Sequence, residues 1–191
     1  GNWGNRPSNS LATILLPWLP QTLASVEKRK VAVRTILAEW PDIAWNLIIQ
    51  LLPGQHQTSS GSHRPSWRKT IPHDWENGVT HQEYWEQASF YAELAVAAAG
   101  QDTARLSALI DHFDNLPEPA FDQLLQAVSS RPISDLPEEQ RFSVWDHLAK
   151  FTNKHRRFAD AKWALPVKLI TRIEEVAEQL APANPFNLYQ P

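Results

Sequence analysis

The sequence contains no cysteine and no methionine, and only six of its 191 residues are glycine. The absence of cysteine excludes disulfide bonds, thiol nucleophiles and cysteine-ligated zinc, so secretion is unsupported and we expect a cytoplasmic protein. The few glycines form no phosphate-binding loop, since the stretch GSHRPSWRK lacks the Gly-Lys-Ser/Thr ending of such a loop. We therefore expect neither nucleotide hydrolysis by this segment nor a bound cofactor.

Long apolar runs are also missing. The longest candidate, IAWNLIIQLL at 43–52, is shorter than the roughly 18 residues of a membrane span and is typical of a buried helix, so no membrane partner is expected. Hydrophobic residues make up 42% and charged residues 20%, which is a globular composition. Because the chain begins GNWGNRP without a signal peptide or an initiator methionine, we interpret it as a segment of a longer protein, with trimming of a whole protein as the alternative.

Charge is distributed unevenly along the chain, although the net formal charge is only −3. Residues 100–140 hold eight acidic and two basic side chains, whereas residues 141–172 hold eight basic and two acidic ones. A net negative chain argues against a protein whose whole surface serves nucleic acid. One interpretation is that the two segments form neighbouring faces that complement each other or are simply solvated. The alternative is that the basic segment is a local docking face.

Helical periodicity or a helix-terminating residue marks nearly every segment, and no segment alternates as a strand does. This pattern predicts an all-α fold of about eight helices, joined mostly by short proline-marked turns. Antiparallel pairs of roughly 35–45 residues would pack side by side, as an α-solenoid-like array or an irregular bundle. We expect one helical domain over 1–191, with a long irregular loop at 53–80 and an extended tail at 181–191.

The inner faces of the first helices can be predicted from apolar spacing. Between 25 and 40, the expected inner stripe runs from Val26 through Val33 to Trp40, and Arg29 is expected on the solvent side. The following helix, 43–52, is apolar almost all round and is expected to be central and buried.

Similar spacing defines the later helices. Gly100 is expected to end one helix in a left-handed conformation, and Asp102 to cap the next. The expected inner residues of the last two helices are Phe142, Trp145, Leu148 and Ala149, then Leu169, Ile170, Ile173, Val176, Ala177 and Leu180.

The segment 63–75, HRPSWRKTIPHDW, has neither helical nor strand periodicity. It lies within the predicted irregular loop 53–80. An irregular segment of about 28 residues in a compact domain is typically functional, disordered, or a loop folded down onto the surface. We expect residues 55–62 to be flexible, and Trp67 and Trp75 to pack against the helices with the cations outside. The partner-binding candidates in this segment are Arg64, Trp67, Arg68 and Lys69.

Nine tryptophans are many for this length, and most lie at helix ends or loop joints. A tryptophan at a joint fills the wedge between helix pairs and can bond through its indole N–H to a turn carbonyl. We therefore expect Trp18, Trp40 and Trp163 to be structural anchors that require no ligand.

A second group of candidates lies in the stretch KHRRFADAKWALP, residues 154–166. Basic side chains beside aromatic rings can form a phosphate patch for nucleic acid. Alternatively, the cations lie over the ring of a buried Trp163 or pair with carboxylates such as Asp146 and Asp160. A protein partner would use an exposed Trp or Arg as an anchor. The partner-binding candidates here are Lys154, Arg156, Arg157 and Lys162.

The seven histidines show no metal-binding spacing. Three of them, His56, His63 and His73, fall in the irregular segment, where zinc would need a further ligand such as Asp74 or Glu76. Because the spacing matches no standard pattern, we predict no metal site.

Motifs for catalysis are weak. No serine or threonine lies in a nucleophile motif. The stretch RFSVWDH resembles the all-helical HEPN ribonucleases, in which an Arg and a His separated by four to six residues cleave RNA together, and the resemblance would assign these roles to Arg141 and His147. Phe142 stands where that family usually has a polar residue, and the Arg and His would point about 120° apart on a helix. We predict no catalytic residue and keep a ribonuclease as an alternative.

The stretches LPWLPQT, PDIAWNLIIQLLP, HRPSWR and HRRFADAKWALP resemble helical, TPR- or HEAT-like parts of very large bacterial multidomain proteins. In those proteins such parts join an NTPase core to a sensor array in antiviral defence. The resemblance extends over most of the chain and implies a scaffold or sensor role within a longer polypeptide. It transfers no catalytic residue.

Taken together, the residues favour a non-catalytic helical interaction domain that presents a surface to a protein partner or to other domains of its parent. Nucleic-acid binding through the basic face at 141–172 is the first alternative. The HEPN-like ribonuclease is the second.

Overall fold

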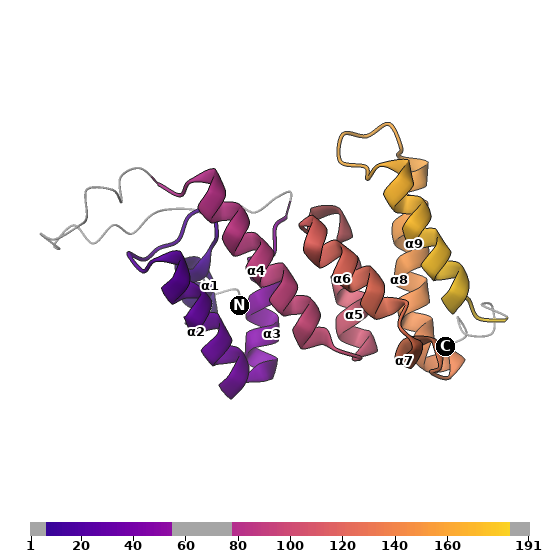
Figure 1. The fold of residues 1–191 in the computed structure, drawn as a ribbon, viewed down its shortest axis with the longest axis horizontal. Helices are drawn as coiled ribbons and strands as arrows, with labels where there is room; N and C mark the ends of the chain where they lie inside the picture. The colour runs from indigo at the N-terminus through magenta and orange to yellow at the C-terminus, as the bar shows by residue number, and fades with distance from the viewer. Residues whose placement is uncertain (1–6, 55–77, 184–191) are drawn as a thin grey trace, which may run out of the picture. The chain divides into compact units, whose positions relative to one another are not determined.

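The computed structural model describes residues 7–54 and 78–183, and every regular element in these ranges is a helix. The all-α prediction is therefore confirmed. The helices, shown in Figure 1, are α1 (Pro7–Leu15), α2 (Val26–Glu39), α3 (Pro41–Leu51), α4 (His81–Ala99), α5 (Thr103–Ile110), α6 (Glu118–Val128), α7 (Arg131–Ser134), α8 (Glu138–Arg157) and α9 (Val167–Leu180). In the described ranges, no helix has the length and apolar character that crossing a membrane requires.

The chain divides into two compact units, residues 1–95 and 96–191, and the boundary falls within α4. The expectation of a single domain over 1–191 stays a prediction. The predicted loop at 53–80 lies mostly outside the described residues, and so does the predicted tail beyond 183.

The first unit is built on the antiparallel pair α2 and α3, which Figure 1 shows side by side. Ser25 caps α2 by accepting a hydrogen bond from the N–H of Lys28, and Pro41 occupies the first turn of α3, where its missing N–H costs nothing. The apolar core of this unit is formed by Leu15, Val33, Ala44, Leu47, Ile48, Leu51, Leu52, Ala88, Tyr91, Ala92 and Ala95.

Three predictions for the first unit were wrong. Arg29, expected in solvent, is only 6% exposed, because its guanidinium finds hydrogen-bond acceptors in the interior. Trp40 is 53% exposed, because it lies past the last turn of α2 with non-helical φ and ψ and so leaves the apolar stripe. Ile43 is 60% exposed, because it lies on the face of α3 that also exposes Asn46 and Gln50, so this helix is not fully buried.

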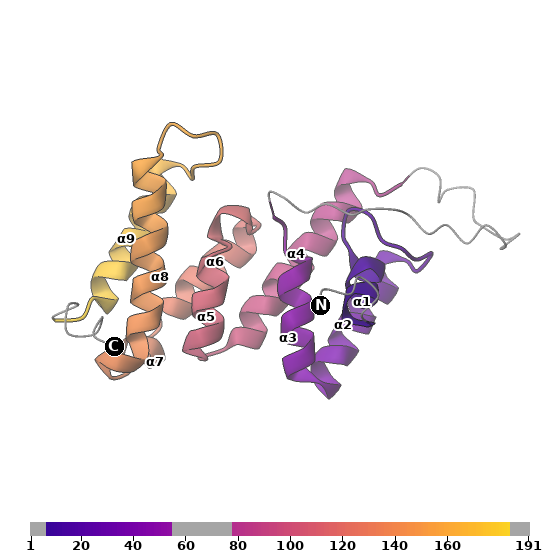
Figure 2. The same ribbon diagram turned by 180° about the vertical axis from the view of Figure 1, so that it is seen from behind.

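The second unit contains α5 to α9. Gly100 adopts φ +54° after α4, as predicted for a left-handed helix stop. Figure 2 shows α8 and α9 side by side as an antiparallel pair, and α5 also packs on α8. At the centre, the ring of Phe113 lies 4.9 Å from that of Phe121 and 5.7 Å from that of Phe151, so residues from three segments share one aromatic cluster.

The inner face of α9 is as predicted, except that Leu169 is half-buried, whereas the inner face of α8 differs. Phe142, Trp145 and Ala149 are half-buried, and the buried stripe of α8 runs instead through Val144, Leu148, Phe151 and His155. The sequence prediction placed the largest apolar residues on the inner face. Because α8 packs against both α5 and α9, the residues that face these two helices are buried instead, and they lie on a different side of α8.

We expect Asp102→Ala to lower the free energy of unfolding by about 1 kcal/mol, the usual value of an N-cap. Asp102 Oδ1 accepts hydrogen bonds from the backbone N–H groups of Ala104 at 2.9 Å and Arg105 at 3.1 Å, and alanine leaves both donors without this acceptor. Urea unfolding followed by circular dichroism measures the change. Asp102→Asn should keep the cap, and Asp160→Ala, in an exposed loop, should have little effect. Equal losses in Asp102→Asn and Asp102→Ala would contradict the capping role.

Candidate functional site

The surface richest in predicted partner-binding residues is the end of the α8–α9 pair. We call it the α8–α9 corner: the last turn of α8, the connection 158–166 and the first turn of α9. Figures 1 and 2 show the connection as a loop that extends past the ends of both helices. Its main side chains are Lys154, Arg156, Arg157, Phe158, Lys162, Trp163, Val167 and Lys168.

The connection is held by backbone hydrogen bonds in successive turns. The N–H of Phe158 donates to Lys154 O, the N–H of Ala161 to Phe158 O, and the N–H of Ala164 to Ala161 O. Pro166 then begins α9, and its carbonyl accepts the first helical bonds. A loop with this many internal bonds presents its side chains in a fixed arrangement.

The buried side chain of His155, on α8, holds the connection against this helix through a hydrogen bond. Its ring is 1% exposed, and its Nδ1 accepts a hydrogen bond from the N–H of Leu165 at 3.0 Å. The ring centroid lies 4.3 Å from that of Phe151 and 5.2 Å from that of Trp163, the latter edge-on. Because Nδ1 is an acceptor here, the neutral ring carries its proton on Nε2, which is buried without a hydrogen-bond partner among the described residues.

Burial favours this neutral form of the histidine. Desolvation lowers the pKa of His155 below its usual value, Asp114 offsets part of that shift, and Lys154 adds to it. The ring therefore fixes the connection as an uncharged acceptor at neutral pH. The sequence prediction missed this role, because it depends on a backbone N–H ten residues away.

Two of the predicted cations lie over aromatic rings of the corner. Lys154 Nζ is 5.0 Å from the centroid of the Trp163 ring, as predicted for cations near that residue, and the guanidinium carbon of Arg157 is 5.5 Å from the Phe158 ring. Both cations are exposed, and so is Lys162. The rings hold these charges in place while leaving them accessible to a partner.

The fourth predicted cation has a different role. Arg156 donates from Nε and Nη2 to the two carboxylate oxygens of Glu174 on α9, at 2.8 and 2.5 Å, and from Nη2 to Thr171 at 3.1 Å. This bidentate pair raises the pKa of Arg156 and lowers that of Glu174. Arg156 thus ties α8 to α9, and its charge is neutralised locally.

Two large apolar residues of the corner were not among the sequence candidates. Phe158 is 49% exposed and Val167 is 59% exposed. Both lie at helix ends, where helical periodicity no longer determines the direction of a side chain, so the sequence contained no signal for their exposure. Exposed aromatic and arginine side chains, such as Phe158 and Arg157, are enriched on surfaces that bind another protein.

The other predicted candidates, Arg64, Trp67, Arg68 and Lys69, lie outside the described residues. The same holds for Trp75, for the expected flexible stretch 55–62 and for the histidines considered as zinc ligands. In the ranges 7–54 and 78–183, no three or more histidine or carboxylate groups are arranged to hold a metal ion.

The tryptophan predictions are corrected in part. Trp18 and Trp163 are half-buried, whereas Trp40 is exposed beside Ile43. We call the segment Glu39 to Ile43 the α2–α3 tip. It carries two large apolar side chains and two carboxylates at the turn between α2 and α3.

The two residues of the ribonuclease alternative have separate hydrogen-bond partners. Arg141 Nη1 donates to the carbonyl of Ser134 at 2.8 Å, whereas His147 Nδ1 lies 3.0 Å from Oδ1 of Asp111, the residue that follows α5. The hydroxyls of Ser107 and Ser143 also meet at 3.0 Å. Polar pairs therefore line the contact between α5 and α8, and both side chains of the RFSVWDH stretch are used within the fold.

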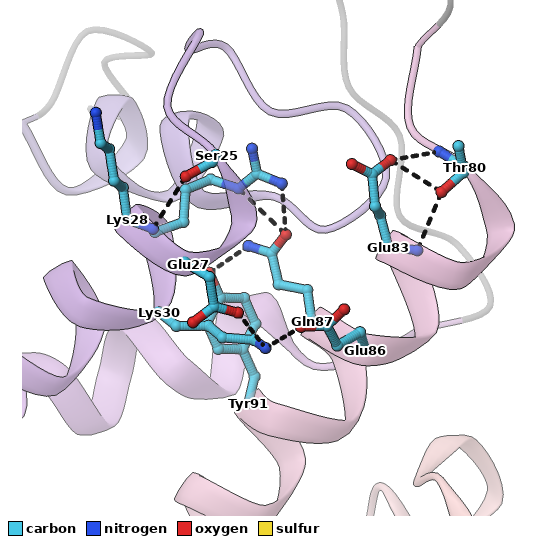
Figure 3. Close-up of polar contacts among 10 residues, drawn as sticks. Ser25, Glu27, Lys28, Lys30, Thr80, Glu83, Glu86, Gln87 and Tyr91 are labelled. Carbon is cyan, nitrogen blue, oxygen red and sulfur yellow. Dashed lines mark hydrogen bonds and ion pairs between the residues drawn. The ribbon is translucent and has the colours of Figure 1, made fainter.

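A buried polar network connects α1, α2 and α4 in the first unit, and Figure 3 shows its members Gln87 and Tyr91 on α4. Arg29 donates from Nε and Nη2 to Gln87 Oε1, at 3.2 and 2.8 Å, and from Nη1 to the carbonyl of Ala24 at 2.7 Å. Gln87 Nε2 donates to the Leu15 carbonyl at 3.2 Å and to the hydroxyl of Tyr91 at 2.5 Å, and that hydroxyl donates to the same carbonyl at 3.1 Å. The polar groups satisfy one another, which indicates a structural role.

Electrostatics supports this interpretation of the network. Burial lowers the pKa of Arg29, with nearby Tyr91 and Glu83 opposing that shift, and burial also raises the pKa of Tyr91. Beside the network, Lys30 forms ion pairs with Glu27 and Glu86 at the surface, as Figure 3 shows. The network therefore holds α4 against α1 and α2 and offers no free group to a ligand.

A shallow groove of about 360 Å³ lies between α6 and α9. The apolar residues that line it are Leu125 and Val176, and across it Arg172 donates to Asp122 at 2.8 Å. Because Arg172, the cation that lines this groove, is already paired with Asp122, the groove offers less cationic charge to a ligand than the α8–α9 corner.

The fold and the surfaces described above define an all-α protein whose exposed chemistry is cationic and aromatic at one corner and acidic and apolar at one tip. Comparison of the chain with models of known protein families, with curated proteins and with solved structures finds no match.

Proposed function

We propose that this chain is a non-catalytic helical interaction domain that binds an acidic protein segment with apolar side chains at the α8–α9 corner. That segment belongs to a protein partner or to another domain of the same polypeptide, as in the scaffold parts of the bacterial defence proteins that the sequence resembles. The observation that supports the proposal is the combination of exposed Phe158 and Val167 with the four exposed cations Lys154, Arg157, Lys162 and Lys168 at the hydrogen-bonded α8–α9 corner.

The composition of the corner favours protein over nucleic acid. Each cation that contacts a phosphate contributes about 0.9 to the slope of log affinity against log salt on duplex DNA, so the four exposed cations Lys154, Arg157, Lys162 and Lys168 supply a modest electrostatic term. The guanidinium of Arg157 already lies over the ring of Phe158, a position that a stacked base would otherwise take. Nucleic-acid binding through 141–172 remains the second proposal, distinguished by its salt dependence.

The test uses two fluorescent probes: a peptide of alternating glutamate and leucine, and an unstructured RNA. We expect Lys154→Glu combined with Arg157→Glu to weaken peptide binding at least about tenfold, because two attractive charges become repulsive. Fluorescence anisotropy at low salt measures both affinities. Arg131→Glu is the matched control, since it reverses an exposed arginine on α7.

The two candidate functions predict different outcomes. Unchanged peptide affinity in the double variant, with the fold intact by circular dichroism, would contradict the corner as the binding surface. Binding of the RNA alone, with a steep loss on adding salt, would replace the protein-binding proposal with the nucleic-acid one.

A further inference from the structure

The α2–α3 tip exposes apolar surface that the fold of its own unit leaves uncovered. Trp40 and Ile43 lie within four residues of each other, and each exposes more than half of its surface. Glu39 and Asp42 lie between and beside them, and residues 35–46 contain no lysine or arginine. The tip therefore combines exposed apolar side chains with carboxylates.

The backbone of the tip is fixed by hydrogen bonds. The N–H of Trp40 donates to the carbonyl of Ile36 at 2.8 Å, and the carbonyl of Trp40 accepts from the N–H of Ala44 at 2.9 Å. Trp40 is therefore both the C-cap residue of α2 and the N-cap residue of α3. An exposed tryptophan on a rigid turn loses little conformational entropy on binding, which is why tryptophan is frequent among the dominant residues of interfaces.

The α8–α9 corner has the complementary composition. Its exposed apolar residues are Phe158 and Val167, and the charges around them are predominantly positive: Lys154, Arg157, Lys162 and Lys168, with Asp160 as the nearby acid. Tip and corner would bury apolar surface against each other and bring opposite charges together. Two tips, or two corners, would bring like charges together, which disfavours symmetric contacts.

We propose that the α2–α3 tip of one copy of the chain docks on the α8–α9 corner of a second copy, so that copies associate head to tail. The inference rests on the proposed function, because it names a second copy as the acidic, apolar partner of the corner. A second copy is favoured because this chain itself carries a surface with the required charge and apolar residues. An interface between two different surfaces is heterologous, so it produces open chains or closed rings.

The experiment is sedimentation velocity at low salt, with the chain between about 10 and about 500 μM, the range that detects micromolar to millimolar dissociation constants. We expect the wild-type mass average to rise above the 21.7 kDa of one copy as the concentration increases. Trp40→Glu at the tip and Phe158→Glu at the corner should each abolish this rise. Val31→Glu, on an exposed position of α2, is the control and should not.

A mixture of the two blocked variants separates head-to-tail docking from other contacts. The Phe158→Glu copy keeps its tip and the Trp40→Glu copy keeps its corner, so an equimolar mixture should form dimers and no larger species. Wild-type chain that stays monomeric up to about 500 μM, or that associates unchanged in both variants, would overturn the inference. A monomeric wild-type chain whose corner still binds the acidic peptide would overturn head-to-tail docking alone and leave the proposed function standing.

Discussion

Replacing Gln87 by leucine should lower the free energy of unfolding by about 3 kcal/mol, a large part of the stability of an ordinary domain. Gln87 Oε1 accepts two hydrogen bonds from the buried guanidinium of Arg29. Its Nε2 donates to the carbonyl of Leu15 and to the hydroxyl of Tyr91. Leucine fills a similar volume but removes both functions, so a buried positive charge loses its side-chain acceptor.

The loss of stability arises from the buried partners of Gln87, which the substitution leaves without a hydrogen bond to this side chain. A buried polar group without a partner costs about 1–3 kcal/mol, and a charged one costs more. The amide of Gln87 bonds to groups of both α1 and α2, so its loss should loosen the contact of α4 with these two helices. Urea unfolding followed by far-ultraviolet circular dichroism measures the change.

The controls separate burial from helix propensity. Gln82→Leu makes the same substitution at an exposed position of α4 and should change stability by less than about 0.5 kcal/mol. The double variant Arg29→Met with Gln87→Leu removes both partners and should recover part of the loss, which a double-mutant cycle detects. A Gln87→Leu protein as stable as Gln82→Leu would show that the network contributes nothing to folding.

This network also shows where sequence patterns stop being informative. Apolar spacing placed α9 correctly because its inner face is a continuous stripe, and the cap at Asp102 followed from residue type and position. Arg29 was assigned to solvent because hydropathy considers one residue at a time. Its acceptor lies 58 residues away on α4, and a local pattern carries no information about such a partner.

The candidate site was predictable to a similar extent. The cations at 154–162 were visible in the sequence, and the position of Lys154 over the Trp163 ring agrees with the expectation. The exposure of Trp40 and Phe158 was not visible, because both stand at helix ends, where helical periodicity no longer determines the direction of a side chain. The buried acceptor beneath the connection depends on the packing of three rings, which composition cannot specify.

His155→Ala should lower the free energy of unfolding by about 3 kcal/mol. The substitution leaves a cavity between the rings of Phe151 and Trp163, and it removes the acceptor of the Leu165 N–H. Urea unfolding measures the loss. His147→Ala, on the same helix but partly exposed, should cost less than about 1 kcal/mol. Equal losses in the two variants would contradict the special role of the buried ring.

Stability should also fall as the pH is lowered from 7 to 5, and part of that fall should depend on His155. Burial holds the pKa of the folded His155 below 6.5, so the unfolded chain takes up the proton first. The stabilising effect of the neutral ring is therefore complete above pH 6.5 and is lost as the pH falls from there toward the folded pKa. Around the ring, Asp114 favours protonation, Lys154 opposes it, and Phe151 and Trp163 are uncharged.

The variant for this measurement is His155→Phe, which keeps a ring of similar size and does not titrate. Its stability should depend less on pH between 7 and 5 than that of the wild-type chain. His112→Phe is the comparison variant. Burial also lowers the pKa of His112, so this variant should lose the contribution of His112 to the pH dependence and keep that of His155. A His155→Phe protein whose stability depends on pH as steeply as that of the wild-type chain would contradict the prediction.

Where the slope does decrease, protonation of His155 removes the acceptor that holds Leu165, so acidification should weaken peptide binding at the α8–α9 corner before the protein unfolds.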